Sequence, residues 1–156
     1  VLDMISSYLS TGKSSVLYKK LVDDKTMAIQ AGAINASQED YGTCILYGLP
    51  QGETKLEDLI KEIDEEIALM QTELISDRSY QKLQNQFENN YVNSNSSVEG
   101  VANSLARYHV LYGDTNLINS EIDIYRSITR EEIQTVAKKY LNPNQRLILE
   151  YLPKTK

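Results

Sequence analysis

Residues 27–49 read MAIQAGAINASQEDYGTCILYGL, and this stretch decides the fold. It contains two short runs, Met27–Ile34 and Thr43–Leu49, with the alternating side-chain pattern that half-buried strands show. The polar segment Asn35–Asp40 between them suits a hairpin loop. The small residues at 31–33 allow another element to pack closely on the first strand. We therefore expect a β-hairpin with other elements packed against it.

Most of the remaining chain has helical spacing, with apolar residues recurring every three or four positions. Capping boxes are predicted at Thr54 with Glu57 and at Thr129 with Glu132. A cap is also expected at Ser76 or Asp77 and another at Asp114 or Thr115, a break at Asn93–Ser97, and a helix end at Gly113. The expected helices are 1–9, 16–24, 55–70, 77–91, 98–112, 116–125 and 130–141.

After Asn142-Pro143-Asn144, the apolar run Arg146–Leu152 indicates a final strand. Helices clustered around at least three strands predict an α+β fold, with the helices on one face of a mostly antiparallel sheet. The length of 156 residues favours a single domain, 1–156. Because the chain opens at Val1 inside an apolar pattern, we expect this domain to be truncated at its N-terminus from a longer parent.

Composition excludes several classes of function. The formal net charge is −6 and the basic residues are scattered, which argues against a nucleic-acid partner. No apolar run reaches 18 residues, so no membrane span is expected. A single cysteine excludes an internal disulfide and is compatible with both a periplasmic and a cytoplasmic location. The eleven tyrosines are expected at half-buried positions with their hydroxyls in water.

Candidate chemical groups are few. His109 and Cys44 are the only residues of their types, and a catalytic zinc site normally takes three protein ligands. The acidic run at 62–66 is typical of a solvated helix face, and Gly12-Lys13-Ser14 lacks the earlier glycine of a phosphate-binding loop. We therefore predict no catalytic, cofactor-binding or metal-ligating residue in this chain.

Three stretches resemble the insulinase/pitrilysin family of zinc peptidases, especially its processing-peptidase-like bacterial members. The first, Gly12–Lys25, reads GKSSVLYKKLVDDK and is similar to the family's G-x-S-S-R-L-Y-x-x-L-R-E-E-K segment. The second is Leu105–Tyr108 followed by Tyr112–Asp114. The third, Ile128–Pro143, reads ITREEIQTVAKKYLNP and is similar to the family's closing I-T-x-E-D-I-x-x-V-A-x-K-Y-L-x-P. Together the matches span roughly residues 1–153.

The resemblance implies a C-terminal domain of a zinc metallopeptidase that helps to enclose a peptide. The family's zinc signature, H-x-x-E-H, is absent, so the resemblance places the zinc in an N-terminal domain of the parent. The implied partners are that zinc domain, a second homologous subunit in some arrangements, and an unfolded peptide substrate. The fragment is then not catalytic alone, although its parent is expected to be a zinc metalloendopeptidase.

The sequence departs from the family at two positions. In some relatives the non-catalytic half supplies an Arg and, seven residues later, a Tyr that hold the substrate. An ungapped alignment places Val22 and Ile29 there, and neither side chain can donate a hydrogen bond. This favours the companion domain of the zinc-bearing half.

Two alternatives remain open at this point. The first is a non-catalytic scaffold or interaction subunit of the same fold, as in the processing-peptidase and respiratory-complex core proteins of the family. The second is a free-standing peptide-binding module.

Overall fold

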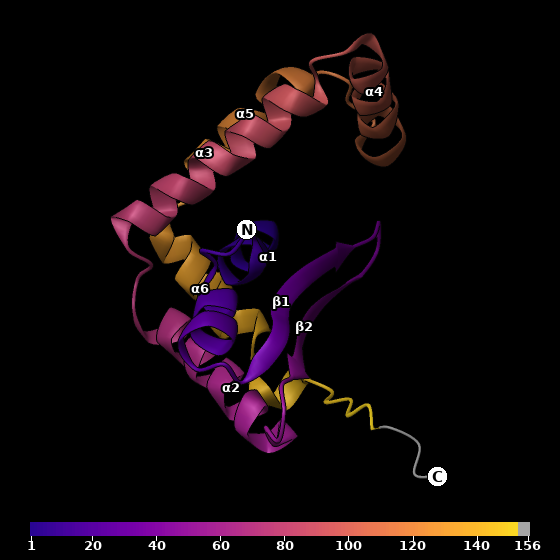
Figure 1. The fold of residues 1–156 in the computed structure, drawn as a ribbon. Coiled ribbons are helices and arrows are strands. Elements are labelled where there is room, and N and C mark those ends of the chain that lie inside the picture. The colour runs from indigo at the N-terminus through magenta and orange to yellow at the C-terminus, as the bar shows by residue number, and fades with distance from the viewer. Residues whose placement is uncertain (153–156) are drawn as a thin grey trace.

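A computed structural model describes residues 1–152 and shows an α+β fold. The body holds a two-stranded sheet with helices packed against it, and a helical arm extends from this body (Figure 1). The elements in chain order are α1 (Leu2–Ser10), the π-helix η1 (Tyr18–Asp24), β1 (Ala28–Ser37), β2 (Gly42–Pro50), α2 (Leu56–Thr72), α3 (Asp77–Ser94), α4 (Val98–Tyr112), α5 (Leu117–Ser127), α6 (Arg130–Tyr140) and the 3₁₀ turn η2 (Pro143–Gln145).

The hairpin forms as the alternation predicts. Strands β1 and β2 pair antiparallel, with Ala33 opposite Leu46 and Ile34 opposite Ile45. Ala33 and Leu46 belong to the core, whereas Ile34 and Ile45 are exposed. Because opposite residues in an antiparallel pair point to the same side, one face of the sheet is buried and the other is bare.

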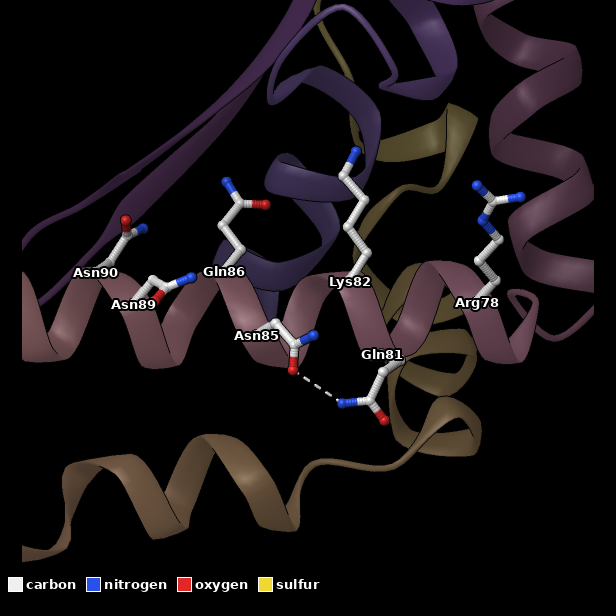
Figure 2. Close-up of a pocket in the computed structure, with 7 residues that line it drawn as sticks. All are labelled: Arg78, Gln81, Lys82, Asn85, Gln86, Asn89 and Asn90. Atoms are coloured by element: carbon white, nitrogen blue, oxygen red, sulfur yellow. Dashed lines mark hydrogen bonds between the residues drawn. The ribbon is translucent and has the colours of Figure 1, made fainter.

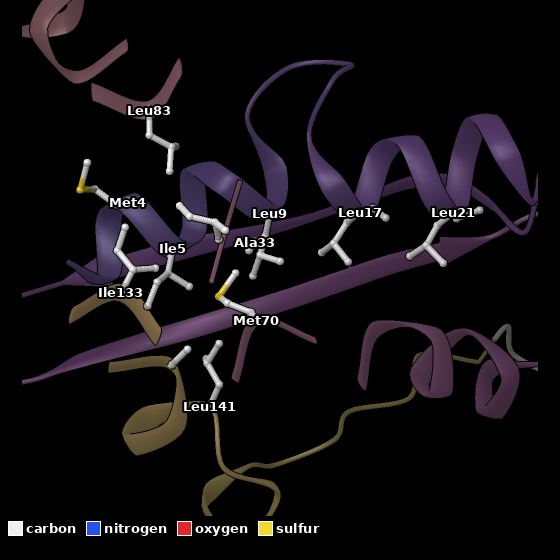
Figure 3. Close-up of a cluster of buried hydrophobic side chains, with 14 of the residues drawn as sticks. Met4, Ile5, Leu9, Leu17, Leu21, Ala33, Met70, Leu83, Ile133 and Leu141 are labelled. Carbon is white, nitrogen blue, oxygen red and sulfur yellow. The ribbon is translucent and has the colours of Figure 1, made fainter. Parts of the chain in front are cut away.

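The core lies between the covered face of the hairpin and helices from both ends of the chain. Ala31 and Ala33 of β1 are buried with side chains from the first two helices, from α2 and α3, and from α6 (Figure 3). Small side chains on β1 let the helices approach closely, and Gly48 does the same on β2, where a Cβ would lie 2.7 Å from Leu59 of α2. The largest fully buried apolar side chains are Met4, Ile5, Leu9, Leu17, Leu21 and Ile133.

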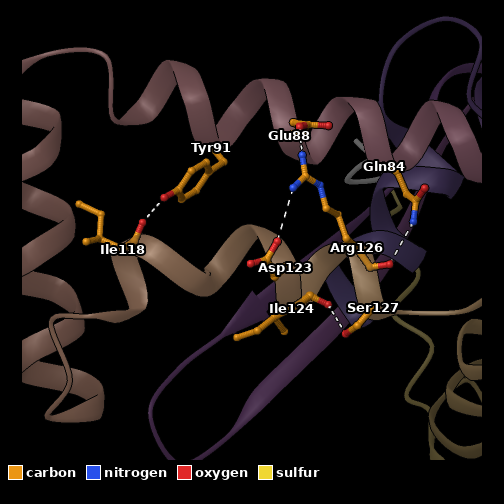
Figure 4. Close-up of polar contacts among 8 residues, drawn as sticks. All are labelled: Gln84, Glu88, Tyr91, Ile118, Asp123, Ile124, Arg126 and Ser127. Carbon is orange, nitrogen blue, oxygen red and sulfur yellow. Dashed lines mark hydrogen bonds and ion pairs between the residues drawn. The ribbon is translucent and has the colours of Figure 1, made fainter.

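The arm consists of α3 and α5, which lie side by side, with α4 at the end away from the body (Figure 1). The rings of Phe87 on α3 and Tyr125 on α5 stack with their centroids 4.6 Å apart. Tyr91 donates its hydroxyl hydrogen to the Ile118 carbonyl, and Arg126 pairs with Glu88 (Figure 4). Aromatic stacking and polar cross-links therefore join the two helices along their length.

The tyrosines are only partly as expected. Tyr80, Tyr91 and Tyr108 lie at buried or half-buried helix positions, as predicted. Their hydroxyls, however, meet protein acceptors on or next to α5 rather than water, and the Tyr80 hydroxyl lies 2.6 Å from the Ile128 carbonyl. These three residues therefore act as specific cross-links of the arm.

Several predicted helix ends are confirmed. Thr129 and Glu132 form the complete capping box of α6, and the Ser76 hydroxyl caps α3 by accepting a hydrogen bond from the Ser79 N–H. The polar run ends α3 at Ser94, after which Ser97 caps α4. Gly113 follows α4 with a φ of 69°, the left-handed conformation that glycine adopts without steric cost.

Three sequence predictions are wrong. The box at Thr54 and Glu57 does not form, because α2 begins one residue later, with Lys55 at the cap position and no side-chain cap. The α5 cap is Asn116; Asp114 instead accepts a hydrogen bond from the Asn116 N–H in the preceding turn. Residues 146–152 form no strand, so the sheet of the described chain has two strands rather than at least three.

The failure of the last strand has a physical reason. Its side chains are exposed, with 82% of Leu147 and 99% of Tyr151 accessible to solvent. An extended segment becomes a strand only when a neighbour pairs with its N–H and C=O groups, and this segment has no such neighbour in residues 1–152. Apolar composition alone therefore overpredicted the sheet.

The two capping predictions give a matched test of local stability. Thr129→Ala should lower the free energy of unfolding by about 1 kcal/mol, because the N–H of Glu132 loses its acceptor. Thr54→Ala should change it by less than about 0.5 kcal/mol, because no cap is lost there. Urea titration followed by circular dichroism measures both, and equal losses would contradict the assignment.

Candidate functional site

The single histidine and the single cysteine lie in different elements and differ in exposure. His109 is exposed in the last turn of α4, at the end of the arm. Cys44 is half-buried in β2 opposite Asn35, and burial raises the pKa of its thiol, which disfavours the reactive thiolate. Within residues 1–152, no three His, Cys, Asp or Glu side chains gather closely enough to hold a metal ion.

The acidic run on α2 is more than a solvated helix face, and that prediction needs correction. The Lys20 ammonium of η1 lies 3.1 Å from the Glu62 carboxylate and 2.9 Å from that of Glu66, and Glu65 is also within reach. Lys25 also pairs with Glu62. The carboxylates therefore bind lysines, and they fix η1 against α2 instead of offering oxygen atoms to a cation.

This ion-pair group shifts the titration of its members. The hydrogen bond from Lys25, with a second from Lys20, lowers the pKa of Glu62 below its ordinary value. Burial acts to lower the pKa of the Lys20 ammonium, but hydrogen bonds to Glu66 and Glu62 outweigh it and raise that pKa. Both charged forms are thus favoured in the folded state.

The loop Gly12-Lys13-Ser14 connects α1 to the helical turn before η1 and does not follow a strand. Gly12 has a φ of 78°, and the Ser14 hydroxyl lies 2.7 Å from the Lys82 ammonium of α3. No strand and helix N-terminus converge here as a phosphate site requires. The loop therefore links α1 to the turn before η1 and contacts α3 through Ser14.

Val22 and Ile29, the two positions aligned with substrate-holding residues of some relatives, differ in solvent exposure. Val22 is half-buried on η1 and packs against the core, whereas Ile29 on β1 is 65% exposed. Both side chains are apolar, and the two residues form no common polar surface. The inference drawn from these two positions, that the chain is the companion domain of the zinc-bearing half, stays a prediction.

The bare face of the sheet is the first surface with the character of a binding site. It carries Ile34, Ile45 and Leu49, which are 50%, 45% and 48% exposed. Tyr47 lies on the same face over Gly32, where a Cβ would come 2.9 Å from the tyrosine oxygen. Exposed apolar side chains on a sheet favour contact with another polypeptide.

A second surface, which we call the amide trough, runs along α3 (Figure 2). It is an open depression of about 590 Å³. Sequence reasoning missed it because it concentrated on the apolar stripe of this helix. The signal was present as a run of amides at helical spacing. The trough is lined by Arg78, Gln81, Lys82, Asn85, Gln86, Asn89 and Asn90.

Solved structures with the same fold come from bacterial proteases. The inactive peptidase domain of a candidate zinc protease from Bordetella parapertussis matches with a TM-score of 0.84 and 19% identity, over 99% of this chain and 82% of that one. A candidate zinc protease from Bordetella pertussis Tohama I matches with a TM-score of 0.82 and 20% identity, over 98% and 84%. At these identities the likeness shows the fold.

A protease from Helicobacter pylori matches with a TM-score of 0.81 and 25% identity over 92% of this chain. The chain spans only 35% of the length of that protease. No curated protein matches the sequence significantly. The fold is therefore that of an α+β domain found in bacterial proteases.

The family model for the peptidase M16 inactive domain matches residues 1–87, more than half of the chain. The chain belongs to this family, and the part it matches is the inactive domain. This confirms the resemblance to insulinase/pitrilysin zinc peptidases and the prediction of a non-catalytic domain. No helix in residues 1–152 is both long and apolar enough to span a bilayer.

The ion pairs on α2 predict a specific pH dependence. Glu62 has a lowered pKa in the folded state, so its contribution to stability is present above the unfolded value near 4.5 and is lost as the pH falls through the folded value. Glu62→Gln should reduce stability at pH 7 and flatten its decline below about pH 4.5. Denaturant titrations between about pH 3 and pH 7 measure this.

Glu65→Gln is the matched control on the same helix. Glu65 also approaches Lys20, but its side chain is 48% exposed against 13% for Glu62. Exposed pairs contribute little, so the control should keep most of the wild-type pH profile. If stability depends on pH in the same way in the wild type and in the Glu62 variant, the ion pairs of Glu62 do not cause this pH dependence.

Proposed function

We propose that the chain is the non-catalytic domain of a zinc metallopeptidase and forms one wall of a chamber that encloses an unfolded peptide. The observation that carries the proposal is the match of the chain to the family of inactive peptidase domains. The bare apolar face of its own sheet supports it. In this proposal the zinc is held by a domain N-terminal to the chain in a longer parent. An H-x-x-E-H sequence there would supply the ligands and the general base.

Residues 1–152 contain no set of three side chains that fits a zinc ion. The carboxylates of Glu62 and Glu66 are paired with Lys20, Glu62 also with Lys25, and the single histidine lies on α4. Chemistry in the proposed assembly therefore belongs to the partner domain. The part of this chain is to hold the peptide and to exclude water from it.

The bare sheet face suits the wall of a peptide chamber. Ile34, Ile45 and Leu49 offer apolar contact that does not depend on a particular peptide sequence. An unfolded peptide exposes apolar side chains that a folded protein buries, so such a surface selects for the unfolded state. The partners in this proposal are the zinc domain of the parent, a second homologous subunit where two chains enclose the chamber, and the peptide.

The scaffold alternative has its own support. The chain shares its fold with a domain that is described as inactive, so the fold persists without a catalytic centre of its own. An activity assay distinguishes the two functions: a peptidase parent cleaves an unfolded peptide in a zinc-dependent way, and a scaffold does not. A parent that assembles but does not cleave would favour the scaffold.

The first test concerns metal. The purified 156-residue chain should hold less than about 0.1 zinc per chain, because it lacks a set of three ligands. Elemental analysis by mass spectrometry after dialysis measures this content. A value near one zinc per chain that survives dialysis would overturn the placement of the metal in another domain.

The second test concerns the wall. In the complete parent, Ile34→Ser combined with Ile45→Ser should raise the KM for an unfolded, apolar peptide by about tenfold and leave kcat nearly unchanged, because ground-state contacts are lost. The same truncation at Val98, an 89% exposed residue of α4, is the matched control. An unchanged KM in the double variant would show that this face does not line the chamber.

A further inference from the structure

The amide trough on α3 differs from an ordinary solvent-exposed helix face. Its lining contains five primary amides, one arginine and one lysine, and no carboxylate, in a chain with a net charge of −6. Solvated helix faces usually carry charged residues of both signs. Composition therefore sets this face apart from the acidic surface of α2.

The asparagines on α3 are placed where they cost helix stability. Asn85, Asn89 and Asn90 lie in the interior of the helix, where asparagine is less favourable than alanine, glutamate or lysine by roughly 0.5 kcal/mol per residue. Asn89 and Asn90 are exposed, and their side chains make no hydrogen bond to other groups in residues 1–152 that would offset this cost. Positions that contradict local propensity are where function is expected.

The side chains form rows along the helix. Arg78, Lys82, Gln86 and Asn90 follow one another at a spacing of four residues, and Gln81, Asn85 and Asn89 do the same beside them (Figure 2). Four residues of α-helix rise about 6 Å. Two residues of an extended peptide span about 6.6 Å, so alternate peptide groups of such a chain meet successive side chains of a row.

The chemistry of the rows matches a peptide main chain. A primary amide presents a donor and an acceptor side by side, as a peptide group does, and can pair with it without reading a side chain. Asn85 accepts from Gln81 at 3.0 Å, which orients its amide and leaves its own N–H₂ available to donate. The open shape of the depression suits a chain that passes along it.

The two cations stand at one end of the trough. Lys82 is held by its hydrogen bond to Ser14 in the loop after α1, which keeps its charge beside α3. Arg78 lies one turn closer to the start of the helix. A carboxylate at one end of the bound segment would meet both charges, and no acidic side chain lines the trough.

From these observations we propose that the amide trough binds an extended peptide through its main chain, with a peptide carboxylate at the end beside Arg78 and Lys82. The proposal rests on the proposed function only in taking an unfolded peptide as the ligand. It adds a second, polar holding site on the arm, separate in its residues from the bare face of the sheet.

The experiment uses the complete parent protein with EDTA present, so that no peptide is cleaved. The probe is a fluorescein-labelled peptide of about ten Gly, Ser, Ala and Glu residues with a free C-terminal carboxylate, followed by fluorescence anisotropy. Asn89→Ala combined with Asn90→Ala should weaken binding of this peptide about tenfold. A peptide of scrambled sequence should bind the wild type equally well and be weakened by the variant to the same extent, because only the main chain is recognised. Arg78→Gln should remove the preference for the free carboxylate over its amidated form.

The control variant is Asn93→Ala combined with Asn103→Ala, which changes two exposed amides outside the trough. Both double variants should melt at a temperature equal to or a few degrees above that of the wild type, because alanine favours helix. Weakened binding in a protein that is more stable excludes unfolding as its cause. Equal affinity of the trough variant and the control would overturn the proposal, as would a wild-type protein that does not bind the probe.

The outcomes for the two proposals are distinct. If the trough variant binds the probe normally while the Ile34 and Ile45 variant has a raised KM, the trough proposal is wrong and the proposed chamber wall is supported. If the parent shows no zinc-dependent cleavage but the trough variant binds the probe more weakly than the wild type, the proposed peptidase function is wrong and the trough proposal is supported.

Discussion

The packing of helices onto a hairpin of small residues is the constraint on which the rest of the structure depends. A two-stranded hairpin alone is at best marginally stable in water, so β1 and β2 need the apolar faces that cover them. Ala31 and Ala33 have small side chains and Gly48 has none, which lets α1 and α2 approach the hairpin. Larger side chains there would push the helices away and expose the leucines and isoleucines beneath them.

This constraint also explains why α1 and α6, which are far apart in the sequence, pack together. Helix α6, near the C-terminus, buries Ile133 and Ala137 in the same core as Met4 and Ile5 of α1. The amide of Gln71 on α2 donates to the last carbonyls of α6, at 3.2 Å and 3.0 Å from Ala137 and Leu141. Covering one face of the sheet so completely leaves the other face as the surface available to partners.

Periodicity predicted the elements well because each has a local physical cause. The hairpin follows from alternation, α6 from the box at Thr129, and the break before α4 from its polar run. Sequence could not place what depends on distant neighbours. The run 146–152 looks like a strand but has no pairing partner, and the acids of α2 looked solvated because Lys20 approaches them only in the fold. The two candidate surfaces could not be located from the sequence for the same reason, because their exposure depends on which faces the other elements cover in the fold.

The arm leaves the body and returns to it at one place. Arg130 at the start of α6 contacts the Ile75 carbonyl at 3.2 Å and the Asp77 carboxylate at 2.8 Å, while Tyr80 reaches Ile128. The entry and exit of this excursion are thus tied to each other independently of what lies between them. Such a junction lets the intervening helices lengthen, shorten or drift in sequence without disturbing the core. The family sequence model ends at residue 87, inside α3, whereas the structural matches continue through the arm. The arm can therefore change in length or sequence while the hairpin and the helices that cover it keep their packing.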